Sequence, residues 1–96
     1  MKILEQNFRT SFGEIDIVAR DGNEIVFVEV KTRASNRFGE PKEAVTLHKQ
    51  HTIRQVATVY LKKHNLLDSA SVRFDCISIL QSDGHDFEVE HLKNAF

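Results

Sequence analysis

Two kinds of apolar spacing divide the chain, and each predicts a different secondary structure. Near both ends, short segments alternate apolar and polar residues or are rich in valine and isoleucine, which is typical of β-strands. The expected strands are residues 2–10, 13–20, 24–33, 71–80 and 87–92. Asp21-Gly22 and Asp83-Gly84 are turn signals, and residues 34–41 predict a loop because they contain Gly39 and Pro41.

The middle of the chain has helical spacing instead. From Lys42 to about His64, apolar residues recur at i, i+3, i+4, i+7 and i+8, which predicts an amphipathic helix. These residues are Ile53, Val56, Ala57, Tyr60 and Leu61. Thr46 is a candidate N-cap near its start. The order of three strands, a helix and two strands predicts one α/β domain over residues 1–96, or an α+β domain, with the helix on one face of a mixed sheet.

The expected hairpin over residues 13–33 has two unequal faces. If Asp21 and Gly22 form a two-residue turn, Ile15 faces Val28 and Ile17 faces Val26, and this apolar face is expected to lie on the core. The other face starts from apolar pairs near the turn and ends in charged residues. Its members are Val18, Ile25 and Phe27, followed by Glu14, Asp16, Glu29 and Lys31. In this register Asp16 and Glu29 are diagonal neighbours.

Carboxylates that face one another in a half-buried sheet repel, and a divalent cation would remove that repulsion. Mg²⁺ or Mn²⁺ suits Asp16 and Glu29, because such ions take one or two carboxylates and keep several waters. Lys31 would then lie beside the cation and stabilise negative charge on a phosphate. Glu14 is a candidate accessory ligand. The alternative is a salt-bridged strand end in which Lys31 merely neutralises Asp16 and Glu29.

Charge is distributed unevenly, although the net charge of the 96 residues is only −1. Residues 31–63 contain eight basic and two acidic side chains, a balance of +6, between two acidic segments. This basic third predicts a surface for nucleic-acid phosphates, with a solvated helix face as the alternative. Arg33, Arg37 and Lys49 are its candidate phosphate contacts, and Gln50 is a weaker one. Lys49 could equally be a surface lysine whose stem covers apolar residues.

Other features of the composition limit the class of protein. No apolar run approaches the ~20 residues of a membrane span, and a single cysteine, Cys76, fits a reducing compartment, so a cytoplasmic protein is expected. Cys76 lies on the apolar face of its strand and is expected in the core. Arg73 and Asp75 share the opposite face and are expected to pair as a structural bridge.

Several motifs resemble those of one protein family in the order in which that family has them. They are "FGEIDIVARDG", "VFVEVKTR", "FGEPKEAVTLHKQ", "VRFDCISI" and "HLKNAF". An aspartate followed by Glu-Val-Lys on the next strand resembles the PD-(D/E)xK nuclease superfamily, and the full set resembles its bacterial YraN-like branch over essentially the whole chain.

This resemblance implies a restriction-endonuclease-like fold and hydrolysis of DNA phosphodiesters by metal-activated water. It implies that Asp16, Glu29 and the backbone carbonyl of Val30 bind Mg²⁺ or Mn²⁺, and that Lys31 assists the attacking water. Family members usually carry a glutamate-containing helix before the first strand, whereas this sequence starts at "MKILEQNF". We therefore expect activity to depend on that helix, and the sheet surface it would cover to favour a homodimer. The alternatives are a non-catalytic nucleic-acid-binding module and a dimeric scaffold with a vestigial site.

Overall fold

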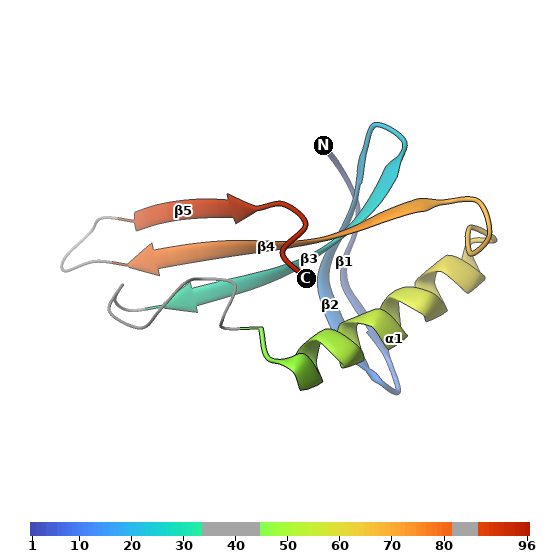
Figure 1. Cartoon of the computed structure of the whole chain (residues 1–96), viewed down its shortest axis with the longest axis horizontal. Helices are drawn as coiled ribbons and strands as arrows, with labels where there is room; N and C mark the ends of the chain where they lie inside the picture. The colour runs from blue at the N-terminus through green and yellow to red at the C-terminus, as the bar shows by residue number, and fades with distance from the viewer. Residues whose placement is uncertain (34–44, 82–86) are drawn as a thin grey trace.

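A computed structural model of the chain describes residues 1–33, 45–81 and 87–96 (Figure 1). The described residues form five strands and one helix. The elements are β1 (Lys2–Thr10), β2 (Gly13–Asp21), β3 (Glu24–Arg33), α1 (Leu47–Lys63), β4 (Ser71–Gln81) and β5 (Phe87–Leu92). The expected loop over residues 34–41, Arg37 and the Asp83-Gly84 turn lie outside the described residues. Within the described part of the chain, no helix is long and apolar enough to cross a membrane.

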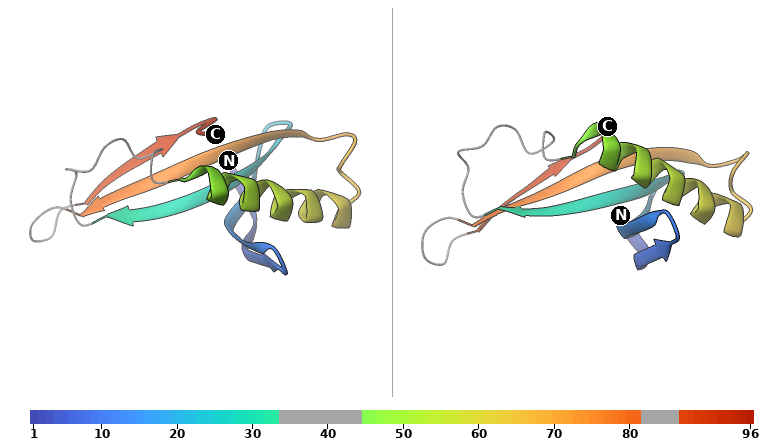
Figure 2. Two further views of the ribbon diagram at one scale, coloured as in Figure 1. Left: turned by 60° about the horizontal axis from the view of Figure 1, so that its bottom comes forward. Right: turned by 90° about the horizontal axis from the view of Figure 1, so that it is seen from below.

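The strands make one sheet in the order β1-β2-β3-β4-β5. Neighbouring strands are antiparallel except β3 and β4. These two are parallel, because the connection through α1 returns the chain to the end of the sheet at which β3 begins. Figures 1 and 2 show α1 along one face of this sheet, with the β1–β2 hairpin turned steeply away from β3–β5. The predicted α/β class, mixed sheet and single main helix are therefore confirmed.

Helix α1 begins where its cap residue can satisfy a free backbone amide. The Thr46 side chain accepts a hydrogen bond from the Lys49 N–H at 3.1 Å, which confirms Thr46 as a cap, but α1 begins after it at Leu47 rather than at the predicted Lys42. The predicted apolar stripe is also confirmed, since all five of its members are buried. They pack with Phe27 and Phe8 from the sheet into the larger of two apolar clusters, in which Tyr60 meets both phenylalanine rings edge-on.

The predicted register of the β2–β3 hairpin is wrong by two residues. Asp21 pairs with Glu24 and Val18 pairs with Phe27, so the turn residues are Gly22 and Asn23 rather than Asp21 and Gly22. Gly22 has a φ of 61°. A glycine with positive φ at the first central position fits the tight turns that join twisted strands. A register shift of two residues leaves each side chain on the same face of the sheet. It also brings Asp16 closer to the position directly opposite Glu29.

The prediction that a single face of the hairpin lies on the core holds only in part, because Ile15, Val26 and Val28 are buried as predicted but the other face is buried as well. Helix α1 packs on the face that carries Val18, Ile25 and Phe27, which is the face with the charged end. Ala19, Val26 and Val28 form a smaller cluster on the opposite face, so both faces bury apolar side chains near the hairpin turn.

Strand β2 also departs from strict alternation. Ile15 and Val18 both belong to the helix-side cluster although they are three residues apart, whereas Ile17 lies with the opposite cluster. The irregularity therefore falls at Asp16. On β1, Asn7 lies level with Asp16 and has a left-handed φ of 54°. A paired irregularity of this kind bends a hairpin and redirects the side chain at the break.

Candidate functional site

Asp16 finds a backbone partner on the next strand just beyond the end of the β2–β3 pairing. The described β2–β3 pairing ends at Ile17 and Val28, and beyond it the Asp16 Oδ2 atom accepts a hydrogen bond from the Val30 N–H at 2.8 Å. The carboxylate thus takes the place of a ladder acceptor. This bond holds Asp16 against β3 at the point where Glu29 and Lys31 emerge.

Glu29 is the buried member of the site, with 6% of its surface exposed. Burial raises its pKa to about 7, and the charge of Asp16 and a hydrogen bond with Asp16 add to the rise. Lys49 and Lys31 oppose the rise, because a nearby positive charge favours the carboxylate. The protonated form of Glu29 therefore persists to a much higher pH than that of an ordinary glutamate.

Two lysines from different elements border this pair of acids. Lys31 Nζ lies 3.8 Å from Glu29 Oε1, and Lys49 projects from the first turn of α1 close enough to lower the pKa of Glu29. The strand period already places Lys31 beside Glu29 from the sequence, whereas Lys49 reaches Glu29 only because the helix packs on the sheet. The arrangement is a carboxyl pair, buried at Glu29 and half-buried at Asp16, with positive charge on both sides.

The remaining candidates are placed less centrally. Glu14 pairs with Arg9 across the β1–β2 ladder at 2.5 Å, so it faces the neighbouring edge strand. Gln50 Nε2 donates to the Val45 carbonyl at 3.0 Å, which ties its amide to the residue before the helix. Arg33 ends β3, and Arg37 lies outside the described residues. The predicted cluster of three acids therefore reduces to Asp16 and Glu29.

This donor set fits a weakly held hard cation. Among the described residues, no group of three or more histidine, cysteine, aspartate or glutamate side chains is arranged to hold a metal. Mg²⁺ commonly uses one or two protein carboxylates and fills the other positions with water or phosphate oxygens. Asp16 and Glu29 meet that requirement, and their mutual repulsion supplies a physical reason to bind a cation.

Sequence reasoning missed Ser78, which lies on β4 beside Lys31 in the parallel register. Its hydroxyl is fully buried and has no hydrogen-bond partner within the part of the chain that the structure describes. A serine within an apolar strand carries no sequence signal for this, because its neighbours on β3 are 47 positions away in the chain.

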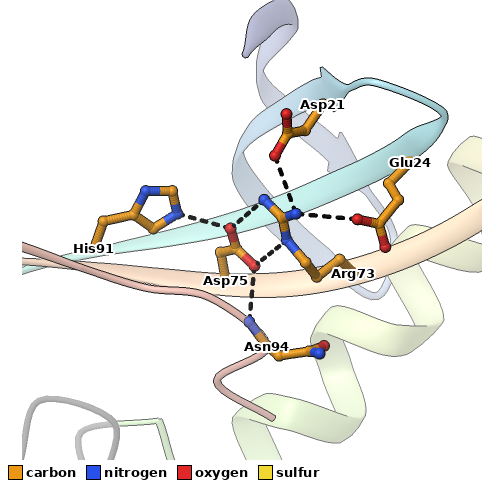
Figure 3. A network of polar contacts seen from close by, with 6 residues as sticks. All are labelled: Asp21, Glu24, Arg73, Asp75, His91 and Asn94. Atoms are coloured by element: carbon orange, nitrogen blue, oxygen red, sulfur yellow. Dashed lines mark hydrogen bonds and ion pairs between the residues drawn. The ribbon is translucent and has the colours of Figure 1, made fainter.

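A second polar network lies on the face opposite α1 (Figure 3). Arg73 donates to both oxygens of Asp75 at 2.9 and 3.0 Å, which confirms the predicted bridge. Asp75 is fully buried and also contacts His91 Nε2 at 2.7 Å and the Asn94 N–H at 3.0 Å. Arg73 reaches Asp21 and Glu24 at 3.1 Å as well.

The charge state of Asp75 follows from these contacts. Burial alone would raise its pKa, but hydrogen bonds from Arg73, Asn94 and His91 outweigh burial and lower it. The carboxylate therefore stays ionised and holds the hairpin turn, β4 and the C-terminal residues together. We read this network as structural, because its buried acid is already fully partnered.

Comparison with known proteins places the chain in a family. The sequence model of the uncharacterised protein family UPF0102 matches residues 1–79. The chain is 57% identical to a UPF0102 protein of Geobacter metallireducens over 99% of this chain and 76% of that protein. It is 53% identical to one of Geotalea daltonii (98% and 73%) and 48% identical to one of Thermodesulfovibrio yellowstonii (99% and 79%). The match extends over most of the chain and of each relative, so this protein belongs to the UPF0102 family, the YraN-like family that its motifs resemble.

Proposed function

We propose that this protein is a divalent-cation-dependent nuclease of the PD-(D/E)xK superfamily that hydrolyses DNA phosphodiesters. The observation that carries the proposal is the buried Glu29 carboxyl beside Asp16, flanked by Lys31 and Lys49. Perturbed carboxyl groups with a specific charge partner gather at functional sites more often than elsewhere. The sequence order Asp16, Glu29, Lys31 on adjacent strands matches the order of the superfamily motif.

Each residue has a role in this reaction. Asp16 and Glu29 would hold Mg²⁺ or Mn²⁺, with the Val30 carbonyl as a candidate further ligand, and the ion would supply an activated water and positive charge for the phosphate. The water oxygen forms a bond to phosphorus while the bond to the leaving sugar oxygen breaks. Lys31 stabilises the negative charge that develops on the phosphate oxygens. Lys49 and Arg33 attract the phosphate backbone.

A second candidate is a nucleic-acid-binding module without catalysis. The small number of candidate metal ligands favours it. Glu14 is paired with Arg9, so Asp16 and Glu29 are the two candidate carboxylate ligands that remain among the described residues. A dimeric scaffold with a vestigial site is the third candidate. These candidates differ in whether a cation binds at Asp16 and Glu29 and whether any DNA is cut.

The test of the proposal separates metal binding from chemistry. Lys31→Ala should retain Mn²⁺ binding while cleavage falls about 100-fold to 1,000-fold, the usual cost of removing one group that stabilises transition-state charge. Asp16→Asn should lose Mn²⁺ binding yet still accept the Val30 N–H. The measurements are titration calorimetry with Mn²⁺ and cleavage of duplex, single-stranded and branched DNA.

Glu14→Gln is the matched control, because it removes a carboxylate on the same strand that is paired with Arg9. It should leave both Mn²⁺ binding and cleavage close to wild type. Mn²⁺ binding without cleavage of any DNA would favour the binding module. Equal Mn²⁺ titrations for wild type and Asp16→Asn would contradict the site itself.

A further inference from the structure

The buried hydroxyl of Ser78 is anomalous for a folded protein. Ser78 is 0% exposed, and its Oγ atom has no hydrogen-bond partner among the described residues. Most buried side-chain polar atoms are paired, because an unpaired one loses its bonds to water and gains nothing in return. A hydroxyl at this position therefore weakens the fold relative to a methyl group.

Its position relates the hydroxyl to the proposed site. In the parallel β3–β4 register, Ser78 lies beside Lys31, and Cys76 lies beside Glu29. Phe27, Glu29 and Lys31 alternate on the face that α1 covers, and Cys76 and Ser78 alternate on the same face. The strand neighbour of the unpaired hydroxyl is thus the lysine of the proposed site.

Lys31 is loosely held in the structure. Its Nζ atom lies 3.8 Å from Glu29 Oε1, which is longer than a hydrogen bond, and its side chain is 31% exposed. A lysine ammonium has three donors and a flexible stem. Adjacent strands lie roughly 5 Å apart, so a residue beside Lys31 is within reach of that stem.

We propose that Ser78 is a positioning residue whose hydroxyl accepts a hydrogen bond from the Lys31 ammonium when a divalent cation occupies Asp16 and Glu29. This inference rests on the proposed function. A cation on Glu29 competes with Lys31 for the carboxylate and repels the ammonium, so the ammonium leaves Glu29. Ser78 then holds it on the same face, beside the phosphate, at a defined place.

The other neighbour of Ser78 gives a competing account. Glu90 of β5 pairs with Ser78 in the antiparallel register, but it is exposed and on an edge strand. A bond from Ser78 to Glu90 would make the hydroxyl a structural tie between β4 and β5. That account predicts the same behaviour with and without a cation.

The test uses three variants of the full chain. Ser78→Ala removes the hydroxyl, Ser78→Thr keeps a hydroxyl, and Cys76→Ala is the control for lost packing one pair earlier on the same face. NMR of ¹⁵N-labelled lysine ammonium groups reports hydrogen bonding directly, because a bonded ammonium exchanges its protons slowly. Lys31→Arg identifies the Lys31 signal. Thermal unfolding without metal and Mn²⁺ titration complete the set.

Addition of Mg²⁺ should make the Lys31 ammonium signal appear in wild type, in Ser78→Thr and in Cys76→Ala, but not in Ser78→Ala. Without metal, Ser78→Ala should melt at the same temperature as wild type or higher. Its cleavage rate should fall at least 10-fold through kcat, with KM for DNA unchanged.

Three results would overturn the inference. A clear drop in the metal-free melting temperature of Ser78→Ala would show that the hydroxyl already has a partner. A Lys31 signal in Ser78→Ala that responds to Mg²⁺ as in wild type would show that Ser78 does not hold the lysine. No Mg²⁺ or Mn²⁺ binding by wild type would remove the proposed function together with the inference, whereas the first two results leave the proposed function standing.

Discussion

At the scale of one residue, the ionised form of Glu29 destabilises the folded state. The side chain is 7% exposed and lies beside a second carboxylate, with its nearest cation at 3.8 Å. The raised pKa records the cost of ionising it there. Strongly perturbed carboxyl groups cluster at functional sites, and in the proposed function a divalent cation would complete the environment of Glu29.

The first prediction concerns pH. The folded state keeps the Glu29 proton up to about pH 7, whereas the unfolded chain releases it near 4.5. The stability that Glu29 contributes therefore falls as pH rises from about 4.5 to about 7, by about 3 kcal/mol in total. Glu29→Gln cannot ionise, so its stability relative to wild type should rise over that range and level off above pH 7.

Urea denaturation at pH 4.5, 6 and 8 measures this difference. Glu88→Gln on β5 is the control, because that carboxylate is exposed and lies away from the site. At pH 8, Mg²⁺ should stabilise wild type and not Glu29→Gln. A stability difference between Glu29→Gln and wild type that is the same at all three pH values would contradict the buried, coupled carboxyl.

At the scale of elements, two polar devices hold strands together on opposite faces of the sheet. On the helix side, the Asp16 carboxylate bonds to the Val30 N–H where the β2–β3 ladder stops. On the far side, Asp75 joins β4 to the residues after β5, and Arg73 joins β4 to the β2–β3 turn (Figure 3). On the helix side, the only ion pair that the Asp16 and Glu29 carboxyl groups make among the described residues is the 3.8 Å contact with Lys31. On the far side, both oxygens of Asp75 have hydrogen-bond partners. The first device therefore belongs to the proposed site, and we read the second as structural.

The second prediction tests that assignment. Asp75→Ala should destabilise the protein by about 3–5 kcal/mol, because removing one partner of a buried ion pair leaves the other charge uncompensated. Arg73 would remain with Asp21 and Glu24 alone. Asp68→Ala is the control, at an exposed position between α1 and β4. Chemical denaturation provides the measurement, and a loss under about 1 kcal/mol would contradict a structural network.

At the scale of the whole molecule, the proposed site lies where the helix and the sheet meet. The start of α1 brings Lys49 to the charged end of β3, while Lys62 and Lys63 lie in its last turn. The helix therefore carries basic residues at both ends, of which the first end borders the carboxyl pair. The expected homodimer stays a prediction; Phe87 and Val89 of β5 are exposed by 61% and 68%.

The third prediction concerns nucleic acid. Lys49→Gln should weaken binding of any DNA sequence and reduce the slope of log affinity against log salt by about 1, because one phosphate contact releases about one counterion. Lys62→Gln is the matched control, since it removes the same charge roughly 20 Å away along the helix. Fluorescence anisotropy over a range of salt concentrations gives both slopes. Equal effects of the two variants would indicate non-specific attraction rather than a surface around the carboxyl pair.

The sequence by itself determined the elements and the family. Apolar spacing identified the five strands and α1 of the described chain, although α1 begins at Leu47 rather than at Lys42. The full set of motifs identified the family, which the comparisons confirm. These features are local, because periodicity, capping and motif spacing depend on residues close together in the chain.

Only the tertiary structure decided the register, the face and the partners. The positive φ of Gly22 fits a hairpin turn at Gly22 and Asn23. The change in side-chain alternation at Asp16 places both Ile15 and Val18 of β2 against the helix. Arg9 engaged Glu14, α1 brought Lys49 to Glu29, and the parallel pairing of β3 with β4 placed Ser78 beside Lys31. Each of these depends on contacts between elements distant in the sequence. Burial and electrostatic environment arise from such contacts, so the raised pKa of Glu29 and the unpaired hydroxyl of Ser78 emerged only with the packed fold.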